Sequence, residues 1–166
     1  MSLNKLNADY LRVGQPPEDQ LRICKHALLE VCGWSEEAQD NILLACAARI
    51  TDVTLKSLAE EKIKKNSGFS NDGNFAPLLG LIIGFQGLSV VRTHLRTVGT
   101  WFGVMENALN NLKSPRNAHA HTHFDHTSAA KMQHLQQSPA ILLNVAQQLH
   151  DGLLELEIDL QRRGYC

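Results

Sequence analysis

The clearest periodicity in the sequence is in residues 88–112, LSVVRTHLRTVGTWFGVMENALNNL. Its apolar residues recur at alternating intervals of three and four positions, the period of an α-helix with one narrow apolar stripe. Gly99 and Gly103 weaken the helix propensity and indicate close approach by a neighbouring helix. The pattern predicts one long helix that buries the following residues: Leu88, Val91, Leu95, Val98, Phe102, Met105, Leu109 and Leu112.

Helical patterns continue on both sides of this stretch. Proline and acidic residues after Pro16 predict a helix that ends at Gly33. Ser35 is expected to cap a second helix, whose apolar stripe reaches Val53. The last helix follows Ser138 and ends near Gly164. Since no stretch alternates with period two, the sequence predicts an all-α fold, a bundle of four to five long helices.

The length of 166 residues suits a single helical domain over 1–166, and 43% hydrophobic with 20% charged residues is ordinary for a globular protein. Within it, residues 1–15 are expected to form a loose N-terminal arm. The loop Ser67–Asn74 is rich in Gly, Ser and Asn and is expected to be exposed and mobile.

Charge and cysteine content narrow the functional classes. The net charge of −1 gives no global attraction to nucleic acid, so any such contact must come from a local patch. The longest uncharged run, 74–91, is interrupted by proline and glycine and is expected to be buried, with no membrane partner. The four cysteines lack CxxC or zinc-finger spacing, which favours a reducing, cytoplasmic location.

The segment 114–126, SPRNAHAHTHFDH, admits two chemistries. HTHFDH resembles the zinc motif of the metallo-β-lactamase superfamily, which implies His121, His123, Asp125 and His126 as metal ligands. That motif needs a preceding β-strand, whereas 105–112 has a helical period. The superfamily fold is therefore not expected and no cofactor is predicted, although metal binding by the histidine cluster stays an alternative.

The second chemistry starts from RNAHAH, residues 116–121. Ser114 and Pro115 are expected to end one helix and start another, which puts Arg116 and Asn117 in a first helical turn. A helical bundle with this RNxxAH pattern resembles the HEPN superfamily. The resemblance covers most of the chain as fold, and Arg116, Asn117 and His121 as motif.

Many HEPN proteins are metal-independent endoribonucleases, often toxins or antiviral defence factors, that act as homodimers with both motifs at one cleft. The resemblance therefore implies RNA as a partner, a second copy of the chain, and Arg116, Asn117 and His121 as catalytic residues. Other members are non-catalytic nucleotide- or protein-binding modules. That alternative, an antitoxin partner or scaffold, stays open.

The chemistry of RNA fits the endoribonuclease interpretation. RNA supplies its own nucleophile, the 2′-hydroxyl, so cleavage needs proton transfer by histidine and charge stabilisation by arginine. Five positions apart on an ideal helix, Arg116 and His121 would point about 140° apart, so the pairing needs a bent side chain or an irregular turn. Further residues are expected to contact substrate: His119, His123, Arg92, Arg96 and Lys113.

Overall fold

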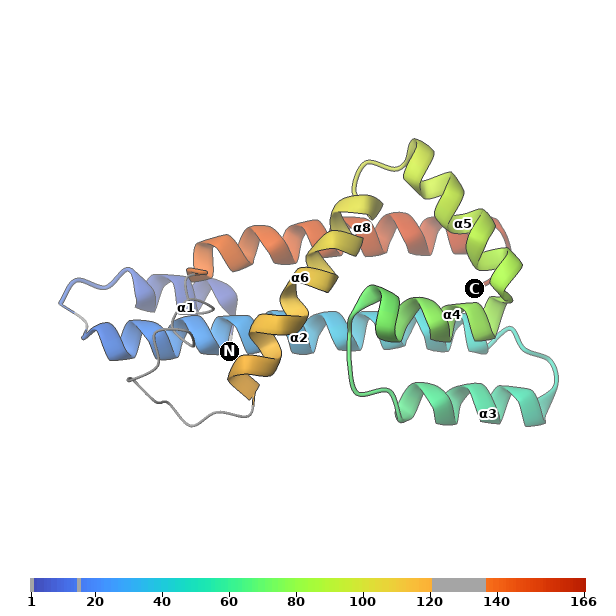
Figure 1. Cartoon of the computed structure of the whole chain (residues 1–166), viewed down its shortest axis with the longest axis horizontal. Coiled ribbons are helices and arrows are strands. Elements are labelled where there is room, and N and C mark those ends of the chain that lie inside the picture. The colour runs from blue at the N-terminus through green and yellow to red at the C-terminus, as the bar shows by residue number, and fades with distance from the viewer. Residues whose placement is uncertain (1, 15, 121–136) are drawn as a thin grey trace.

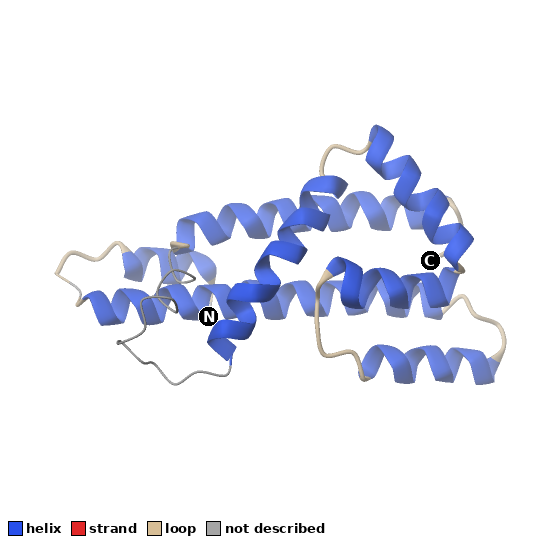
Figure 2. Cartoon of the chain, viewed as in Figure 1, coloured by secondary structure: helices blue, strands red, loops and turns tan. Residues whose placement is uncertain are grey.

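The computed structural model describes residues 2–14, 16–120 and 137–166, and every regular element within them is helical (Figures 1 and 2). The predicted all-α fold is confirmed. The elements are α1 (Leu3–Tyr10), α2 (Pro17–Ala47), α3 (Val53–Lys64), the π-helical turn η1 (Asn71–Phe75), α4 (Ala76–Ile83), α5 (Phe85–Val98), α6 (Phe102–Ala120) and α8 (Pro139–Arg162).

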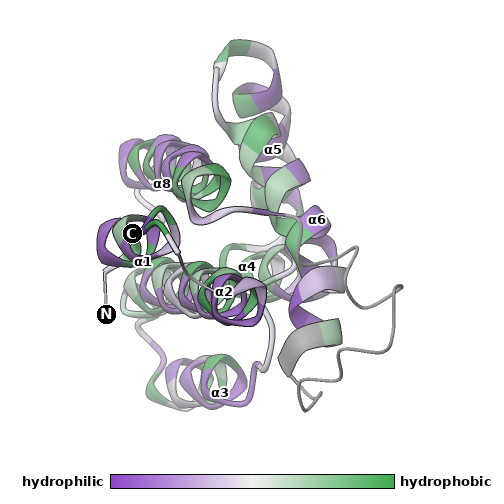
Figure 3. Cartoon of the chain, turned by 90° about the vertical axis from the view of Figure 1, so that its left-hand side faces the viewer, coloured by the Kyte–Doolittle hydropathy of each residue, from purple (hydrophilic) through white to green (hydrophobic). Residues whose placement is uncertain are grey.

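Helices α2 and α8 extend along the length of the molecule, and α6 crosses them obliquely and contacts both (Figure 1). On one side of this frame, α1 packs against α2 and α8. On the other, α4 packs against α2 and leads into α5, which contacts α8. In the end-on view the apolar faces of these helices turn toward the space between them (Figure 3).

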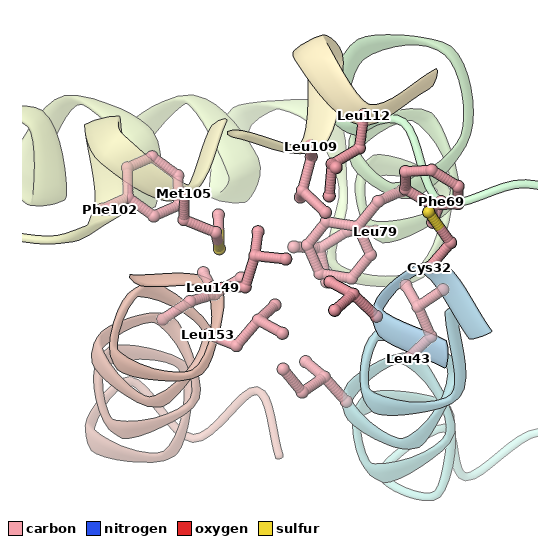
Figure 4. Close-up of a cluster of buried hydrophobic side chains, with 14 of the residues drawn as sticks. Cys32, Leu43, Phe69, Leu79, Phe102, Met105, Leu109, Leu112, Leu149 and Leu153 are labelled. Carbon is pink, nitrogen blue, oxygen red and sulfur yellow. The ribbon is translucent and has the colours of Figure 1, made fainter. Parts of the chain in front are cut away.

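The core fills the space where α2, α4, α6 and α8 meet (Figure 4). Leu43, Leu79, Leu109 and Leu149 come from these four helices and are each buried. Gly152 of α8 permits close contact with α6, because a Cβ atom at this position would lie 2.3 Å from the Cβ of Met105. The helices that carry the candidate site are therefore fixed to one continuous core.

The apolar stripe of residues 88–112 is largely buried, as predicted, but it belongs to two helices and not to one. Val98 is 63% exposed, and residues 99–101 are non-helical and separate α5 from α6. The cause is Glu155 of α8, whose carboxylate accepts hydrogen bonds of 2.9 Å from the backbone N–H groups of residues 100, 101 and 102. It caps α6, and Gly99 is needed because a Cβ there would lie 2.9 Å from Glu155 Oε2. Gly103, in contrast, has open space around it.

The predicted break at Gly33 and Ser35 is wrong, because α2 continues through both. The Ser35 hydroxyl donates to the carbonyl oxygen of Val31 at 2.8 Å, inside the helix, instead of capping a new one. The actual boundary is at Asp52, whose carboxylate accepts from the N–H groups of residues 54 and 55 and caps α3. Burial of one helix face outweighed the local stop signals.

The predicted break at Ser114–Pro115 is also wrong. Helix α6 continues through Pro115 to Ala120, so Arg116 and Asn117 lie in the body of a helix and not in a first turn. The N-terminal arm is likewise not loose over residues 3–10, because α1 forms there and buries Leu6 against the core.

No single helix in the described ranges is both long and apolar enough to cross a membrane, and only the pair Asn71–Ile83 and Phe85–Val98, bent by 119°, reaches that length and composition together.

Candidate functional site

A pocket of about 280 Å³ lies where the 67–74 loop meets the C-terminal half of α6. We call it the Arg116 pocket. Its lining combines Arg116 and Asn117 of the predicted motif with residues of the 67–74 loop, to which the sequence analysis assigned no functional role. Its lining residues are Ser67, Gly68, Phe69, Ser70, Gly73, Asn74, Lys113, Arg116 and Asn117.

The loop wall of the pocket is held rigidly by buried groups. Phe69 and Phe75 are 3% and 2% exposed and anchor the loop in the core at two points. The buried amide of Gln39 donates to the Phe69 carbonyl oxygen at 2.9 Å. Between the anchors the backbone closes the π-helical turn, in which the Phe75 N–H donates to the Ser70 carbonyl at 3.1 Å. The expectation of an exposed, mobile loop is therefore wrong for residues 69–71, which are buried.

A chain of polar side chains gives this wall its shape. Ser70 Oγ donates to Asn74 Oδ1 at 2.6 Å, Asn74 Nδ2 donates to Asn66 Oδ1 at 3.0 Å, and Asn66 Nδ2 donates to the Gly68 carbonyl at 2.8 Å. Gly73 keeps the rim open, since a Cβ there would lie 2.8 Å from Ser70 Oγ and 3.7 Å from Lys113 Nζ. The wall thus presents hydroxyl, amide and backbone groups without charge.

The α6 wall carries the positive charge. Arg116 is half-buried, and its Nη1 donates to Asn117 Oδ1 at 3.3 Å, while Lys113 is exposed at the rim. Among the described residues neither cation forms an ion pair. Burial raises the pKa of the Cys32 thiol, in the nearby core, to about 12, although the Arg116 guanidinium acts in the opposite direction. The thiol therefore stays neutral at pH 7 and does not offset the charge of Arg116.

Arg92 and Arg96, two of the predicted substrate contacts, point instead at Glu106. Arg92 Nη2 lies 2.7 Å from Glu106 Oε1, and Arg96 Nη2 lies 2.8 Å from Oε2. The same carboxylate accepts from Asn71 Nδ2 at 3.1 Å. Because Asn71 begins η1 and Glu106 belongs to α6, this buried network fastens the loop wall to the helix wall of the Arg116 pocket.

Asp72 extends the network at the surface. Its Oδ2 accepts from Asn110 Nδ2 at 3.0 Å, and its Oδ1 lies 3.4 Å from Arg92 Nη2. Lys113 is one turn further along α6 than Asn110 and reaches the pocket rim. Of the three predicted substrate contacts whose side chains are described, Arg92, Arg96 and Lys113, it is Lys113 that lines the pocket.

The histidines of the motif cannot be placed in the same way. His121, His123, Asp125 and His126 lie outside the described residues, and His119 is described only as part of the α6 backbone. Within the described ranges no cluster of three or more His, Cys, Asp or Glu side chains is arranged to hold a metal ion. The metal alternative for the histidine cluster thus stays a prediction.

The loop residues are what sequence reasoning missed. Ser67, Ser70 and Asn74 line the pocket, but their composition is typical of an ordinary exposed turn. The available signal was the pair of aromatic residues Phe69 and Phe75, which bracket the turn and are both buried.

No family model, curated protein or solved structure matches this chain, so the assignment of its function starts from these contacts.

Proposed function

We propose that the protein is a HEPN-type endoribonuclease that cleaves RNA without a metal ion. The observation that carries the proposal is the Arg116 pocket, in which two cations that form no ion pair with a described residue face neutral hydrogen-bonding groups, and none of the described lining residues is acidic. A phosphodiester is the RNA group that such a lining suits, because arginine binds two phosphate oxygens through its planar fork. The pocket volume of about 280 Å³ suits one phosphate and its adjoining sugar rather than a longer segment.

The roles follow from the chemistry of RNA cleavage. The 2′-hydroxyl oxygen attacks phosphorus as a histidine removes its proton, and the bond to the 5′ oxygen breaks as a second histidine protonates that oxygen. Arg116 stabilises the charge that gathers on the phosphorane, and Lys113 holds the neighbouring phosphate. Asn117 orients the guanidinium, because its side-chain oxygen accepts a hydrogen bond from Arg116. The products are a 2′,3′-cyclic phosphate and a 5′-hydroxyl.

His121 is our choice for the proton-transfer residue, on the strength of the RNxxAH motif. One histidine per chain supplies either the base or the acid, so we propose a twofold homodimer in which two copies of Arg116 and His121 share a cleft. We further propose a cytoplasmic setting, in keeping with the four free thiols. Sedimentation at micromolar concentration should show the dimer, and a strict monomer would argue against the composite site.

Arg92 and Arg96 have a positioning role in this proposal. Their charge is directed to the buried Glu106, so they hold the pocket walls together instead of binding RNA. This assignment replaces the substrate contact expected from their spacing on the helix.

A second candidate is the same fold as a non-catalytic module that binds a nucleotide or a partner protein. The observation in its favour is that two cations and several neutral hydrogen-bonding groups line the pocket, while no histidine is among its described lining residues. The two candidates differ in turnover, because only the endoribonuclease produces cyclic phosphate ends.

The test is cleavage of single-stranded RNA by the purified full chain in the presence of a chelator, with DNA of the same sequence as a substrate that lacks the 2′-hydroxyl. Arg116→Ala and His121→Ala should each lower the rate about a hundredfold or more. Arg162→Ala, an exposed arginine at the end of α8, is the matched control and should leave the rate unchanged.

The outcomes separate the alternatives. Cleavage that stops only on chelation, and is lost in His126→Ala, would support the metal site instead. RNA binding without cleavage by the folded wild type would support the non-catalytic module. Activity that survives both Arg116→Ala and His121→Ala would overturn the proposal.

A further inference from the structure

A second hollow, of about 250 Å³, is lined only by α2 and α8. We call it the Trp34 groove, defined by Trp34, Ala38 and Asn41 of α2 with His150, Leu153 and Glu157 of α8. It shares no lining residue with the Arg116 pocket. Helix α1 packs against the same two helices but does not contribute to this lining, so the groove is an opening that the described fold leaves between them.

The groove combines an apolar floor with an exposed aromatic ring. Leu153 is 4% exposed and closes the floor, whereas Trp34 is 38% exposed and forms a wall. Trp34 also lines a neighbouring hollow of about 760 Å³. A partly exposed indole that lines two hollows offers a surface on which a planar or cationic group can stack.

The charge around Trp34 is negative. Glu157 lines the groove and Glu37 lines the neighbouring hollow, and no lysine or arginine is among the described residues that line the two. None of the ion pairs between described residues involves Glu157. Among the described residues, its carboxylate accepts a single, long hydrogen bond of 3.3 Å, from Gln161 in the next turn of its own helix.

We infer that the Trp34 groove binds an arginine side chain from a basic segment of a partner protein. The guanidinium stacks on the Trp34 indole and donates to the Glu157 carboxylate, and Asn41 provides a further acceptor at the edge. The aliphatic part of the arginine lies over Leu153, which removes apolar surface from water. RNA is not the ligand of this groove, because its phosphates would meet the carboxylates.

Arginine fits this site better than lysine for two physical reasons. Its guanidinium is planar and weakly hydrated, so it stacks on an indole at less cost in hydration than an ammonium group. It also donates two parallel hydrogen bonds to one carboxylate, whereas lysine acts as a point charge. The inference stands apart from the proposed nuclease function, since it uses none of the residues of the Arg116 pocket.

The test is titration of the full chain into a fluorescein-labelled tetra-arginine peptide, read by fluorescence anisotropy, with tetra-lysine as the comparison peptide. Saturable binding is expected, tighter for arginine than for lysine. Trp34→Leu and Glu157→Gln should each weaken it by about three- to thirtyfold, the scale of one partly desolvated cation–π contact or charged hydrogen bond.

Two matched variants separate a built site from diffuse attraction. Trp101→Leu removes a tryptophan of nearly equal exposure, 39%, outside the groove, and Glu60→Gln removes an exposed carboxylate of α3. Both should bind within about twofold of wild type. Equal losses in the controls, equal affinity for tetra-lysine, or no saturation at millimolar protein would each overturn the inference.

Discussion

The Arg116 pocket and the Trp34 groove have similar volumes, about 280 and 250 Å³, and opposite charge. Two cations without a carboxylate line the first, and one carboxylate without a lysine or arginine lines the second. A net charge of −1 describes neither of them. The overall charge therefore excludes few classes of partner when a small helical bundle separates its charges onto different surfaces.

The two regions are also built differently. The Trp34 groove follows from the packing of two regular helices, so its shape depends on the helix frame alone. The Arg116 pocket needs an irregular loop, a π-helical turn and a buried network around Glu106. Changes in the frame should therefore affect both regions, whereas changes in the network should affect only the Arg116 pocket.

The largest effect is expected from Gly152→Ala, which should damage both regions together. The new Cβ would lie 2.3 Å from Met105 Cβ and 2.9 Å from the Trp101 carbonyl oxygen, so α6 and α8 must separate. We expect a loss of about 3 kcal/mol in the free energy of unfolding, measured by urea denaturation. Gly103→Ala is the matched control, because its Cβ meets no atom within 4 Å and should be neutral or stabilising.

Glu106→Gln should separate the two regions. It takes the Glu106 carboxylate from both guanidinium groups, although Arg92 keeps Asp72 at 3.4 Å. We expect a cost of about 2 kcal/mol, less than for a fully buried pair because the Arg96 side chain is 53% exposed. The loop wall should loosen, so RNA affinity should fall while tetra-arginine affinity stays the same. Parallel binding titrations measure this, and an equal loss of both affinities would contradict the division.

Glu155→Ala tests the cap that divides the apolar stripe of residues 88–112 into two helices. Three N–H groups of residues 100–102 lose their acceptor, which should cost about 1 kcal/mol in thermal or urea unfolding. Neither Glu155 nor residues 99–102 line the Arg116 pocket or the Trp34 groove, so the proposed affinities of both should be kept. If the variant is as stable as wild type, the Glu155 cap is not needed, and Gly99 alone accounts for the interruption between α5 and α6.

The smallest effect concerns salt. Each phosphate contact on single-stranded RNA contributes about 0.7 to the slope of log affinity against log salt concentration. Lys113→Ala should therefore lower the magnitude of that slope by about 0.7 in RNA binding titrations. Lys64→Ala, an exposed lysine of α3 outside the pocket, should leave the slope unchanged.

The fold class could be predicted from the sequence because the apolar residues that recur with the helical period are largely the ones that are buried. Leu109 and Leu112 are buried where the stripe placed them, and the final helix begins at Ser138 as expected. The helix boundaries could not be predicted, since they depend on contacts with residues that are distant in the sequence. Glu155, which interrupts the helix after Val98, lies 54 positions further along the chain than Trp101, and packing continues α2 past Gly33.

The candidate site was predictable in part. The motif drew attention to Arg116 and Asn117, which do line a pocket, and Lys113 does as well. The other wall was not foreseen, because a Gly- and Ser-rich loop gives no local sign that Phe69 and Phe75 will bury it. The pairing of Arg92 and Arg96 with Glu106 was also hidden, because it joins two helices across the break.

The central claim, that two separate surfaces take ligands of opposite charge, is tested most directly by amide chemical-shift mapping of the ¹⁵N-labelled full chain. One titration uses a single-stranded RNA with 2′-O-methyl groups, which cannot be cleaved, and the other uses tetra-arginine. We predict that the RNA shifts the amides of residues 67–74 and 113–117, and that the peptide shifts those around Trp34, Asn41 and Glu157. Shifts by both ligands on one surface, or RNA shifts centred on Trp34, would contradict the account.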